Sequence, residues 1–376
     1  MRDEKGRPAG SPLRFERVVL ARGAERSPGV QERVLGSCPE ARLERQPDVP
    51  PCRAELSIPP GEDRRTVGKR TLVLGRIGRV LDRNCEPGMG ERVVCFPYWH
   101  FSAVGNCPYD CKFCYLAGNR GNMKCPAVKV YTNLEEVMAA IGRVADRAEG
   151  PVLFYGSKLQ DFVALDPLTE YSRALVPFAA AHPNIRLLFL TKSAAVDGFL
   201  DLDHGGHTIL SWTLNAEVVI GQYEVGTPTL AERLDAARRA ADAGYEVRFV
   251  FMPMIPMAGW RERHAEAMRR ALAAVRASRI TLGGICMYQP ALSAMRRRRD
   301  VDEGCLRPIL DNLERPPTRR ERFRFRPEMR QELYGHMIDG IREIDPTIPV
   351  SLCLETPEVW RSVGLDPTQP ACNCLL

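Results

Sequence analysis

The sequence predicts an α/β protein whose core is a partial barrel of parallel strands surrounded by helices. Short apolar runs of strand length recur from residue 151 onward, at 151–156, 186–191, 208–214, 247–252 and 280–286. Stretches with helical periodicity separate them, and repeated strand–helix–strand units form parallel sheets with right-handed crossovers. Six or so such units predict a partial (β/α)6-type barrel, with its chemistry at the carboxyl ends of the strands.

The helices between these runs have recognisable ends. Residues 133–136 (NLEE) and 229–232 (TLAE) place an Asn or Thr three residues before a Glu, which is the pattern of a capping box. Residues 232–243 and 260–277 carry apolar side chains at helical spacing. Gly244 suits the position just after a helix. We therefore expect helices to begin near residues 133 and 229.

The composition divides the chain into three parts. Residues 1–65 are rich in Pro, Arg and Glu and show no sustained period, which predicts a loosely ordered N-terminal extension. The barrel is expected over residues 66–290. Residues 291–376 form a short C-terminal region with an Arg-rich segment, a helix, a last strand and a Cys-x-Cys tail.

The bulk composition indicates a soluble globular protein, with 44% hydrophobic and 27% charged residues. No apolar run approaches the ~20 residues that cross a bilayer, and no apolar segment follows the charged N-terminus. We therefore expect a cytoplasmic protein without membrane contact. The net charge of +6 favours a nucleic-acid partner only weakly.

Three of the thirteen cysteines form a tight cluster, because Cys107, Cys111 and Cys114 follow a C-x3-C-x2-C spacing. Such spacing can wrap three thiolates around one face of an iron–sulfur cubane, whereas an ordinary ferredoxin cluster or a structural zinc site needs four protein ligands. One iron would then stay open for a small molecule. The alternative is a zinc site completed by a residue outside the spacing, the candidates being His100, Cys95 and Cys125.

This triad, at the start of a strand–helix barrel, resembles the signature of the radical S-adenosylmethionine superfamily. The resemblance implies a 4Fe-4S cluster whose open iron binds S-adenosyl-L-methionine. It also implies reductive cleavage of that cofactor to a 5′-deoxyadenosyl radical that abstracts a hydrogen atom. A reducing electron donor of the flavodoxin or ferredoxin type would be the partner.

Beyond the triad, residues 70–355 resemble the spore photoproduct lyase family. The Glu224–Thr227 stretch (EVGT) is the most distinctive match. The other matching segments are residues 72–88, 94–98, 114–116, 130–136, 190–192, 196–197, 233–234 and 243–245. The resemblance implies lyase-like chemistry, with a damaged or modified base in DNA as the first candidate substrate.

The resemblance also implies a set of cofactor contacts. Lys192 would bind the carboxylate of S-adenosylmethionine, and Thr213 stands where the family has a hydroxyl with the same role. Asn215, on the same strand face, and Ser157 are further candidates for cofactor contact. From the residues alone, Lys192 could equally be a charge at the barrel rim and Asn215 a cap of a strand-end turn.

Two departures from the family concern the end of the reaction. Family members carry a Cys after the second strand that returns a hydrogen atom to the product, and residues 155–161 (YGSKLQD) contain none. One of the family's two Tyr residues near the cluster is Phe113 here, whereas Tyr115 remains. Cys286, at the end of a predicted strand, is the candidate substitute donor. Tyr115 and Cys286 are therefore the candidate catalytic residues.

A second group of cysteines allows a different function. The tail pair Cys372 and Cys374 can chelate one soft metal ion, and Cys85 and Cys95 would approach it if the two ends of the domain pack together. This group, with Cys353, predicts an auxiliary iron–sulfur cluster, a zinc ion or a thiophilic substrate. It favours a biosynthetic enzyme that modifies a small molecule or a peptide.

Two Arg-rich segments bear on the choice of substrate. Residues 296–299 are four consecutive Arg, and Arg alternates with Phe over residues 322–326, preceded by Arg319 and Arg320. The alternation predicts an amphipathic edge strand with an Arg face, suited either to DNA phosphates or to solvent. A non-catalytic metal-binding or DNA-binding module is the third function that the sequence allows.

Overall fold

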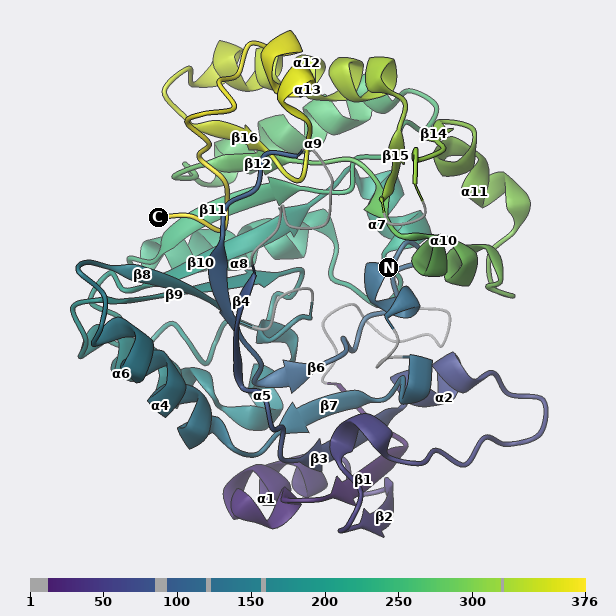
Figure 1. Ribbon diagram of the computed structural model, residues 1–376, viewed down its shortest axis with the longest axis vertical. Coiled ribbons are helices and arrows are strands. Elements are labelled where there is room, and N and C mark those ends of the chain that lie inside the picture. The colour runs from purple at the N-terminus through teal and green to yellow at the C-terminus, as the bar shows by residue number, and fades with distance from the viewer. Residues whose placement is uncertain (1–12, 85–92, 120–122, 157–159, 319–320) are drawn as a thin grey trace.

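The computed structural model describes residues 13–84, 93–119, 123–156, 160–318 and 321–376, and an eight-stranded sheet forms its centre (Figure 1). Parallel pairing runs from β5 to β16, and β4 joins β5 antiparallel. The order of the strands is β16 (Val350–Leu352), β12 (Ile280–Leu282), β11 (Glu246–Phe251), β10 (Thr208–Leu214), β9 (Ile185–Thr191), β8 (Val152–Gly156), β5 (Tyr98–Phe101) and β4 (Leu81–Asn84). The predicted partial α/β barrel is confirmed.

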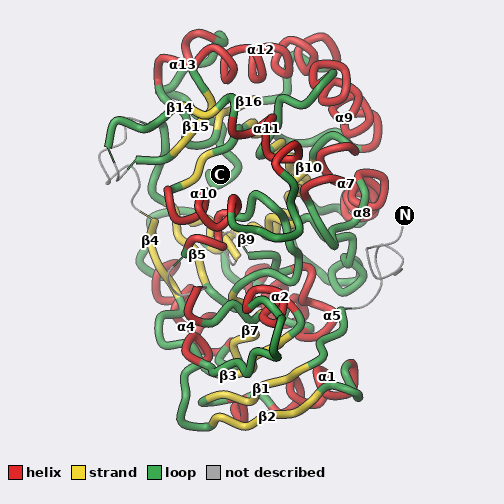
Figure 2. Tube along the Cα trace, turned by 90° about the vertical axis from the view of Figure 1, so that its right-hand side faces the viewer, coloured by secondary structure: helices red, strands yellow, loops and turns green. Residues whose placement is uncertain are grey.

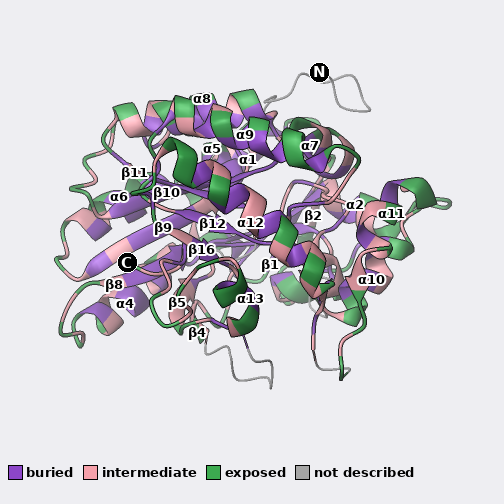
Figure 3. Cartoon of the chain, turned by 90° about the horizontal axis from the view of Figure 1, so that it is seen from above, coloured by how far each residue is buried: buried purple, intermediate pink, exposed green. Residues whose placement is uncertain are grey.

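Helices cover the outside of this sheet, and their outer faces are exposed whereas the strands beneath are buried (Figure 3). None of the described helices is both long and apolar enough to cross a membrane. The helices packed around the barrel are α4 (Leu134–Ala145), α5 (Asp166–Thr169), α6 (Ser172–Ala180), α7 (Glu217–Tyr223), α8 (Leu230–Asp242), α9 (Trp260–Ala274), α12 (Pro327–Ile344) and α13 (Pro357–Ser362), with the 3-10 turn η4 (Val163–Leu165) before α5.

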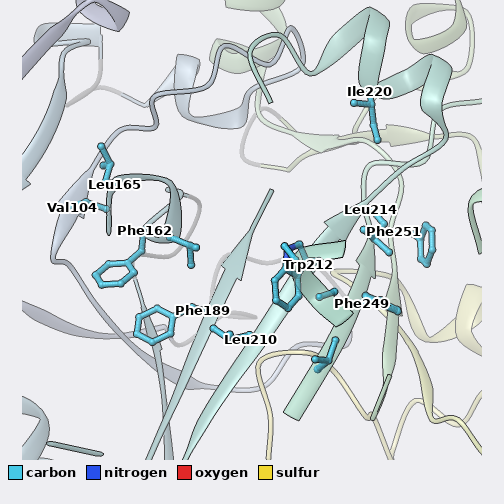
Figure 4. Close-up of a cluster of buried hydrophobic side chains, with 14 of the residues drawn as sticks. Val104, Phe162, Leu165, Phe189, Leu210, Trp212, Leu214, Ile220, Phe249 and Phe251 are labelled. Atoms are coloured by element: carbon cyan, nitrogen blue, oxygen red, sulfur yellow. The ribbon is translucent and has the colours of Figure 1, made fainter. Parts of the chain in front are cut away.

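The central strands are buried on both faces, which explains why they appear in the sequence as continuous apolar runs. All seven residues of β10 are buried. Outward-facing Trp212 packs under the helices (Figure 4), and its indole Nε1 donates to the Ser193 carbonyl at 3.0 Å. Phe162 and Phe189 stack with ring centroids 4.6 Å apart. This core fixes the strand ends that carry the candidate site.

Residues 13–65, predicted to be loosely ordered, instead form part of a second sheet at the base of the molecule (Figure 2). Val18, Val19 and Leu20 in β1 are buried and pair in parallel with β3, so this prediction is wrong. A single apolar strand is a weak local signal, and its partner is more than fifty residues away. The order is β2 (Arg42–Gln46), β1 (Arg17–Ala21), β3 (Thr71–Gly75), β7 (Val128–Tyr131) and β6 (Val104–Gly105), flanked by η1 (Ala24–Arg26), α1 (Pro28–Ser37), η2 (Pro51–Arg53) and α2 (Arg64–Lys69).

The predicted strand over residues 280–286 is split in two. β12 ends at Leu282, and β13 (Cys286–Met287) pairs with a third sheet in the order β13, β15 (Phe323–Phe325), β14 (Leu313–Glu314). Gly283 lies at the break, where an added Cβ would approach the Met252 sulfur to 2.7 Å. The chain therefore leaves the barrel at a glycine packed closely against the Met252 side chain, just after β11, and this turn carries Cys286 out of the barrel sheet.

The Arg-rich strand is likewise not an edge strand. β15 lies in the middle of the third sheet, paired on both sides. Arg322 is 5% exposed, and its guanidinium lies 4.7 Å from the centroid of the Tyr288 ring. Arg319 and Arg320 lie outside the described residues. Helices α10 (Gln289–Arg296) and α11 (Glu303–Leu310) connect β13 to this sheet.

One of the two predicted capping boxes forms. Thr229 and Glu232 satisfy each other's backbone N–H groups at the start of α8, and Gly244 follows that helix with φ +88°. Asn133 precedes α4 but pairs elsewhere: its side chain accepts from Ile77 N and donates to Ile77 O, at 3.1 and 2.9 Å. Tertiary pairing with the loop after β3 therefore replaces the local cap.

The C-terminal tail closes the barrel interior. Arg248 of β11 is 1% exposed and donates to the carbonyls of Asn373 and Leu375, both at 2.7 Å. Buried Asn373 also accepts from the Ser211 hydroxyl at 2.9 Å, and its backbone N–H donates to Thr281 Oγ1 at 3.0 Å. The polar atoms that line this part of the barrel are thus satisfied by the tail.

Replacement of Arg248 tests this closure. Arg248→Met keeps most of the side-chain volume but removes both bonds to the tail and leaves the buried Asn373 carbonyl without this donor, whereas Arg279 still donates to the Leu375 carbonyl. We expect the free energy of unfolding to fall by roughly 1–3 kcal/mol. Urea unfolding followed by circular dichroism measures the change. Exposed Arg238→Met is the matched control and should leave the transition unchanged. Equal midpoints for both variants would show that the tail does not stabilise the barrel.

Candidate active site

The three cysteines of the triad line one cavity at the carboxyl ends of the barrel strands. This inner cavity has a volume of about 230 Å³. Its wall includes Cys107, Cys111 and Cys114 on the loop between β6 and the 3-10 turn η3 (Tyr115–Gly118), together with Lys192, Thr213 and Cys286 from strand ends. With Tyr115, which lines the same cavity, the structure therefore brings together seven of the nine residues that the sequence analysis proposed.

We call the loop that carries the triad, residues 107–114, the cluster loop. Side chains of neighbouring elements donate hydrogen bonds to its backbone carbonyls. Lys69 at the end of α2 donates to the carbonyls of Cys107 and Tyr109, each at 2.6 Å. Arg298 donates to the carbonyls of Asp110 and Cys111, each at 3.3 Å. These donors were missed in the sequence because they lie 38 and 187 residues from their partners. The loop's conformation is thus set from both ends of the chain.

Asn106 starts the cluster loop in a left-handed conformation, with φ +58°. Asn tolerates this region better than most residues. Its buried side-chain amide donates to the carbonyls of Cys125 and Ala127, at 3.2 and 2.7 Å. Cys125 is itself fully buried in the core of the second sheet. The turn at Asn106 directs the chain from β6 into the cluster loop.

The thiols of the triad can serve as ligands of a metal cation that the chain has to bind. Burial raises the pKa of Cys107 to about 12, and burial also raises the pKa of Cys111 well above its ordinary value. Within the described residues, no three His, Cys, Asp or Glu side chains are arranged as a ready-made metal site. Because metal binding favours the thiolate and releases the proton, a cluster would both collect these three thiols and stabilise their charged form. The donor set fits an iron–sulfur cluster with three protein ligands.

Lys192, at the end of β9, forms part of a buried charge network. Its Nζ lies 3.8 Å from Glu224 Oε1, and Arg233 Nη2 lies 2.6 Å from Glu224 Oε2. Burial opposes the charge on each partner, yet Glu224 raises the pKa of Lys192, and Lys192 and Arg233 lower the pKa of Glu224. Lys192 is therefore a cation at the cavity wall. The 3.8 Å separation from Glu224 is too long for a hydrogen bond, so its ammonium protons can serve a ligand.

Asp161 fixes the strand end that carries Lys192. One carboxylate oxygen accepts from the Lys192 backbone N–H at 2.7 Å, and the other accepts from the Thr191 hydroxyl at 2.6 Å. Asp161 is buried, and burial raises its pKa above the ordinary value. It lies four residues after Ser157, which is outside the described residues, so the predicted role of Ser157 stays untested. The role of Asp161 depends on contacts across thirty and thirty-one residues of sequence.

Thr213 and Asn215 have different surroundings although both belong to the end of β10. Thr213 lines the inner cavity, and its carbonyl accepts from Arg233 Nη1 at 2.9 Å. Asn215 is fully buried, and its amide donates to the Pro253 carbonyl at 2.8 Å. Asn215 thus joins the ends of β10 and β11, and a direct contact with a cofactor stays a prediction.

Tyr115 and Cys286 both line the inner cavity. Tyr115 packs against Tyr288 with ring centroids 5.9 Å apart, and Tyr288 lies two residues after Cys286. Gly118 lets η3 approach α10 closely, since an added Cβ would lie 2.2 Å from Ala291 N. The backbone N–H of Gly284 donates to Tyr334 Oη at 2.9 Å, which fixes the turn before Cys286. Cys286 therefore lies in the cavity wall because the chain leaves the barrel at Gly283.

The second group of cysteines also gathers, apart from the inner cavity. Burial raises the pKa of Cys372 to about 12, and the neighbouring thiols of Cys353 and Cys95 raise it further. Cys374 lies near Tyr98 and Tyr155, whose pKa values burial raises. Cys85 lies outside the described residues. Cys95 and Cys353 thus influence the thiol of Cys372, whereas the described members form no ready-made metal site, and an auxiliary metal stays a prediction.

Comparison with known proteins agrees with this geometry. Curated relatives include the spore photoproduct lyases of Geobacillus sp., 34% identical over 199 residues, and Bacillus subtilis, 30% identical over 208 residues. These alignments cover 53% and 55% of this chain and 55% and 58% of the relatives, so they span little more than half of each relative's length.

Solved structures extend the likeness to the fold as a whole. A spore photoproduct lyase complexed with dinucleoside spore photoproduct superposes with a TM-score of 0.75 at 24% identity, covering 92% of this chain and 100% of that chain. A variant of the enzyme with bound AdoMet and dinucleoside spore photoproduct also gives 0.75, at 25% identity, covering 90% and 99%. The family model for spore photoproduct lyase matches residues 62–283, which is more than half of this chain. The chain therefore belongs to the spore photoproduct lyase family of radical S-adenosylmethionine proteins.

Proposed function

We propose that this protein is a radical S-adenosylmethionine enzyme that acts on a damaged or modified base in DNA. The observation that carries the proposal is the inner cavity, where three cysteine thiols and the cationic Lys192 face the same space. Thiolates hold iron, and the ammonium of Lys192 suits the carboxylate of the cofactor's methionine moiety. A cytoplasmic location stays a prediction.

Each residue of the cavity has a distinct part in this proposal. Cys107, Cys111 and Cys114 would hold a 4Fe-4S cluster, and Lys192 and Thr213 would orient S-adenosylmethionine, with Ser157 and Asn215 as further candidates. The cluster and cofactor, when bound, would supply a 5′-deoxyadenosyl radical that abstracts a hydrogen atom from the substrate. Glu224 and Asp161 keep Lys192 charged and in position.

The substrate class is supported by the relatives, two of which were solved with dinucleoside spore photoproduct. This chain lacks their donor Cys, so the return of a hydrogen atom must use another group. Cys286 lines the cavity and is the candidate. Its S–H bond would break and the hydrogen atom would pass to the carbon radical of the product. The resulting sulfur radical would take a hydrogen atom from Tyr115, and the Tyr115 radical would take one from 5′-deoxyadenosine, which would return the 5′-deoxyadenosyl radical.

A second candidate function uses the gathered cysteines. Cys95, Cys353, Cys372 and Cys374 come from three separate segments, and their thiols lie near one another. An auxiliary iron–sulfur cluster, a zinc ion or a thiophilic substrate would satisfy them, in an enzyme that modifies a small molecule or a peptide. Metal analysis separates the two: about four irons per chain and no zinc favours the first function, and eight irons or one zinc the second.

The triad is tested by Cys111→Ala. We expect anaerobically reconstituted variant protein to lose most of its iron, because two thiolates cannot hold the cluster. Production of 5′-deoxyadenosine from S-adenosylmethionine with dithionite should fall at least about a hundredfold. Iron analysis and chromatography measure both. Cys52→Ser, at an exposed cysteine, should leave both unchanged, and a variant that keeps its iron would refute the assignment.

Lys192→Met tests cofactor binding. Removal of a charged donor to a carboxylate should weaken binding of S-adenosylmethionine to the reconstituted protein by about ten- to a hundredfold. Isothermal titration calorimetry measures the dissociation constant. The exposed Lys124→Met is the control. Wild-type affinity in the Lys192 variant would place the cofactor carboxylate elsewhere.

The Cys286→Ala variant separates the first abstraction of a hydrogen atom from the later return of a hydrogen atom to the product. With a deuterated dinucleoside photoproduct as substrate, we expect deuterium to reach 5′-deoxyadenosine at the wild-type rate, since the first abstraction does not use the thiol. The yield of repaired dinucleotide per 5′-deoxyadenosine should fall by about tenfold or more, with by-products in its place. Mass spectrometry measures both quantities. An unchanged product ratio would exclude Cys286 as the donor.

A further inference from the structure

A second cavity, the outer cleft, also borders the cluster loop. It has a volume of about 1020 Å³ and runs between α2 and residues 294–300 at the end of α10. Cys107 and Cys114 line both the outer cleft and the inner cavity. The cluster loop therefore borders both cavities. The proposed cofactor-binding residues line the inner cavity, and the outer cleft is open to solvent.

The wall of the outer cleft carries uncompensated positive charge. It contains eight Arg and Lys side chains and four Asp and Glu side chains. The four acids are all engaged: Asp110 and Asp300 pair with Arg298, Glu62 with Arg70, and Asp63 caps α2. Within the described residues, Lys112, Arg297 and Arg299 have no ion-pair partner, and both Arg are exposed. The rim of the cleft thus presents positive charge that a partner can neutralise.

We propose that the outer cleft docks an acidic, low-potential electron-transfer protein that reduces the cluster, an inference that rests on the proposed function. One electron would leave the donor protein, which is oxidised, and enter the cluster, which is reduced. No bond forms or breaks at this surface. Complementary charge accelerates such encounters and orients the partner. The cations that bind the carbonyls of the cluster loop, Lys69 and Arg298, also favour the added negative charge.

Two features favour a protein partner over a nucleic acid in this cleft. Met123 is 45% exposed and lies in the wall beside Leu116 and Ala117, so the cleft offers apolar contact as well as charge. Protein interfaces bury such apolar contacts, whereas phosphate backbones are bound mainly by polar and charged groups. In addition, a base must reach Cys286 and Lys192, which lie in the inner cavity. Donor and substrate can therefore bind at the same time.

The test reverses two charges on the rim. Arg297→Glu with Arg299→Glu is compared with Arg143→Glu with Arg147→Glu, two exposed arginines at the end of α4 and in the turn just after it, away from the cleft (Figure 1). Fluorescence anisotropy of a labelled flavodoxin measures binding, and 5′-deoxyadenosine production is measured with reduced flavodoxin and, separately, with dithionite. A milder pair, Arg297→Gln with Arg299→Gln, provides a graded response.

We expect the rim reversal to weaken flavodoxin binding and slow flavodoxin-driven turnover by about tenfold at low salt, with a smaller effect at high salt. Dithionite-driven turnover should stay at the wild-type rate, as should every measurement on the α4 control. The inference is overturned if flavodoxin binding is unchanged, or if turnover falls equally with both reductants. It is also overturned if the rim variant loses affinity for an oligonucleotide instead. Failure of wild-type protein to cleave the cofactor with dithionite would refute the proposed function, whereas the binding measurement would still decide this inference.

Discussion

The candidate site depends on how the backbone of the cluster loop is held. Lys69, from the second sheet, and Arg298, from the region after the barrel, both donate to carbonyls of this loop. Hydrogen bonds from a cation to a backbone carbonyl are among the stronger ones in proteins. Because the two donors come from opposite ends of the chain, the loop takes its shape only when the second sheet, the barrel and the C-terminal region have all formed. The three thiols can then face one cavity.

The same cavity shows how a charge is kept at a buried position. Lys192 is cationic because Glu224 lies close to it, and Glu224 is stable as a carboxylate because Arg233 pairs with its second oxygen. A buried charge without partners would cost far more than any single contact returns. The network leaves the Lys192 ammonium facing the cavity while its counter-charge lies behind it. This arrangement suits an anionic ligand group without requiring the ligand for stability.

The proposed hydrogen donor, Cys286, distinguishes this chain from the pattern of the family that it resembles. The loop after β8 has no Cys, and Cys286 reaches the cavity from a different wall, on a short strand that leaves the barrel at Gly283. Tyr115 packs against Tyr288 at this wall. The carboxyl ends of neighbouring barrel strands all meet at one cavity. A cysteine can therefore lie at different positions in the sequence and still place its thiol in that cavity. The same edge of the barrel can therefore accommodate a different geometry for the last step.

The sequence by itself determined the barrel and the identity of the chemical groups. Continuous apolar runs predicted β8 to β11, because parallel strands are buried on both faces, and the cysteine spacing predicted a three-ligand metal loop. Glu224 was visible as part of a family segment, but neither Glu224 nor Asp161 was visible as a residue that positions and charges Lys192. The barrel strands and the cysteine spacing are local patterns, and a linear sequence carries such patterns.

Only the tertiary structure decided the rest, because it depends on contacts between distant residues. Residues 13–65 are ordered because β1 pairs with β3. The predicted strand over residues 280–286 is broken after Leu282, where Gly283 packs against Met252. Burial of the tail depends on Arg248, and the outer cleft forms because α2 and the segment at the end of α10 both flank the cluster loop. Each is a close approach of residues far apart in the chain, and no local periodicity or spacing encodes the partner of such a contact.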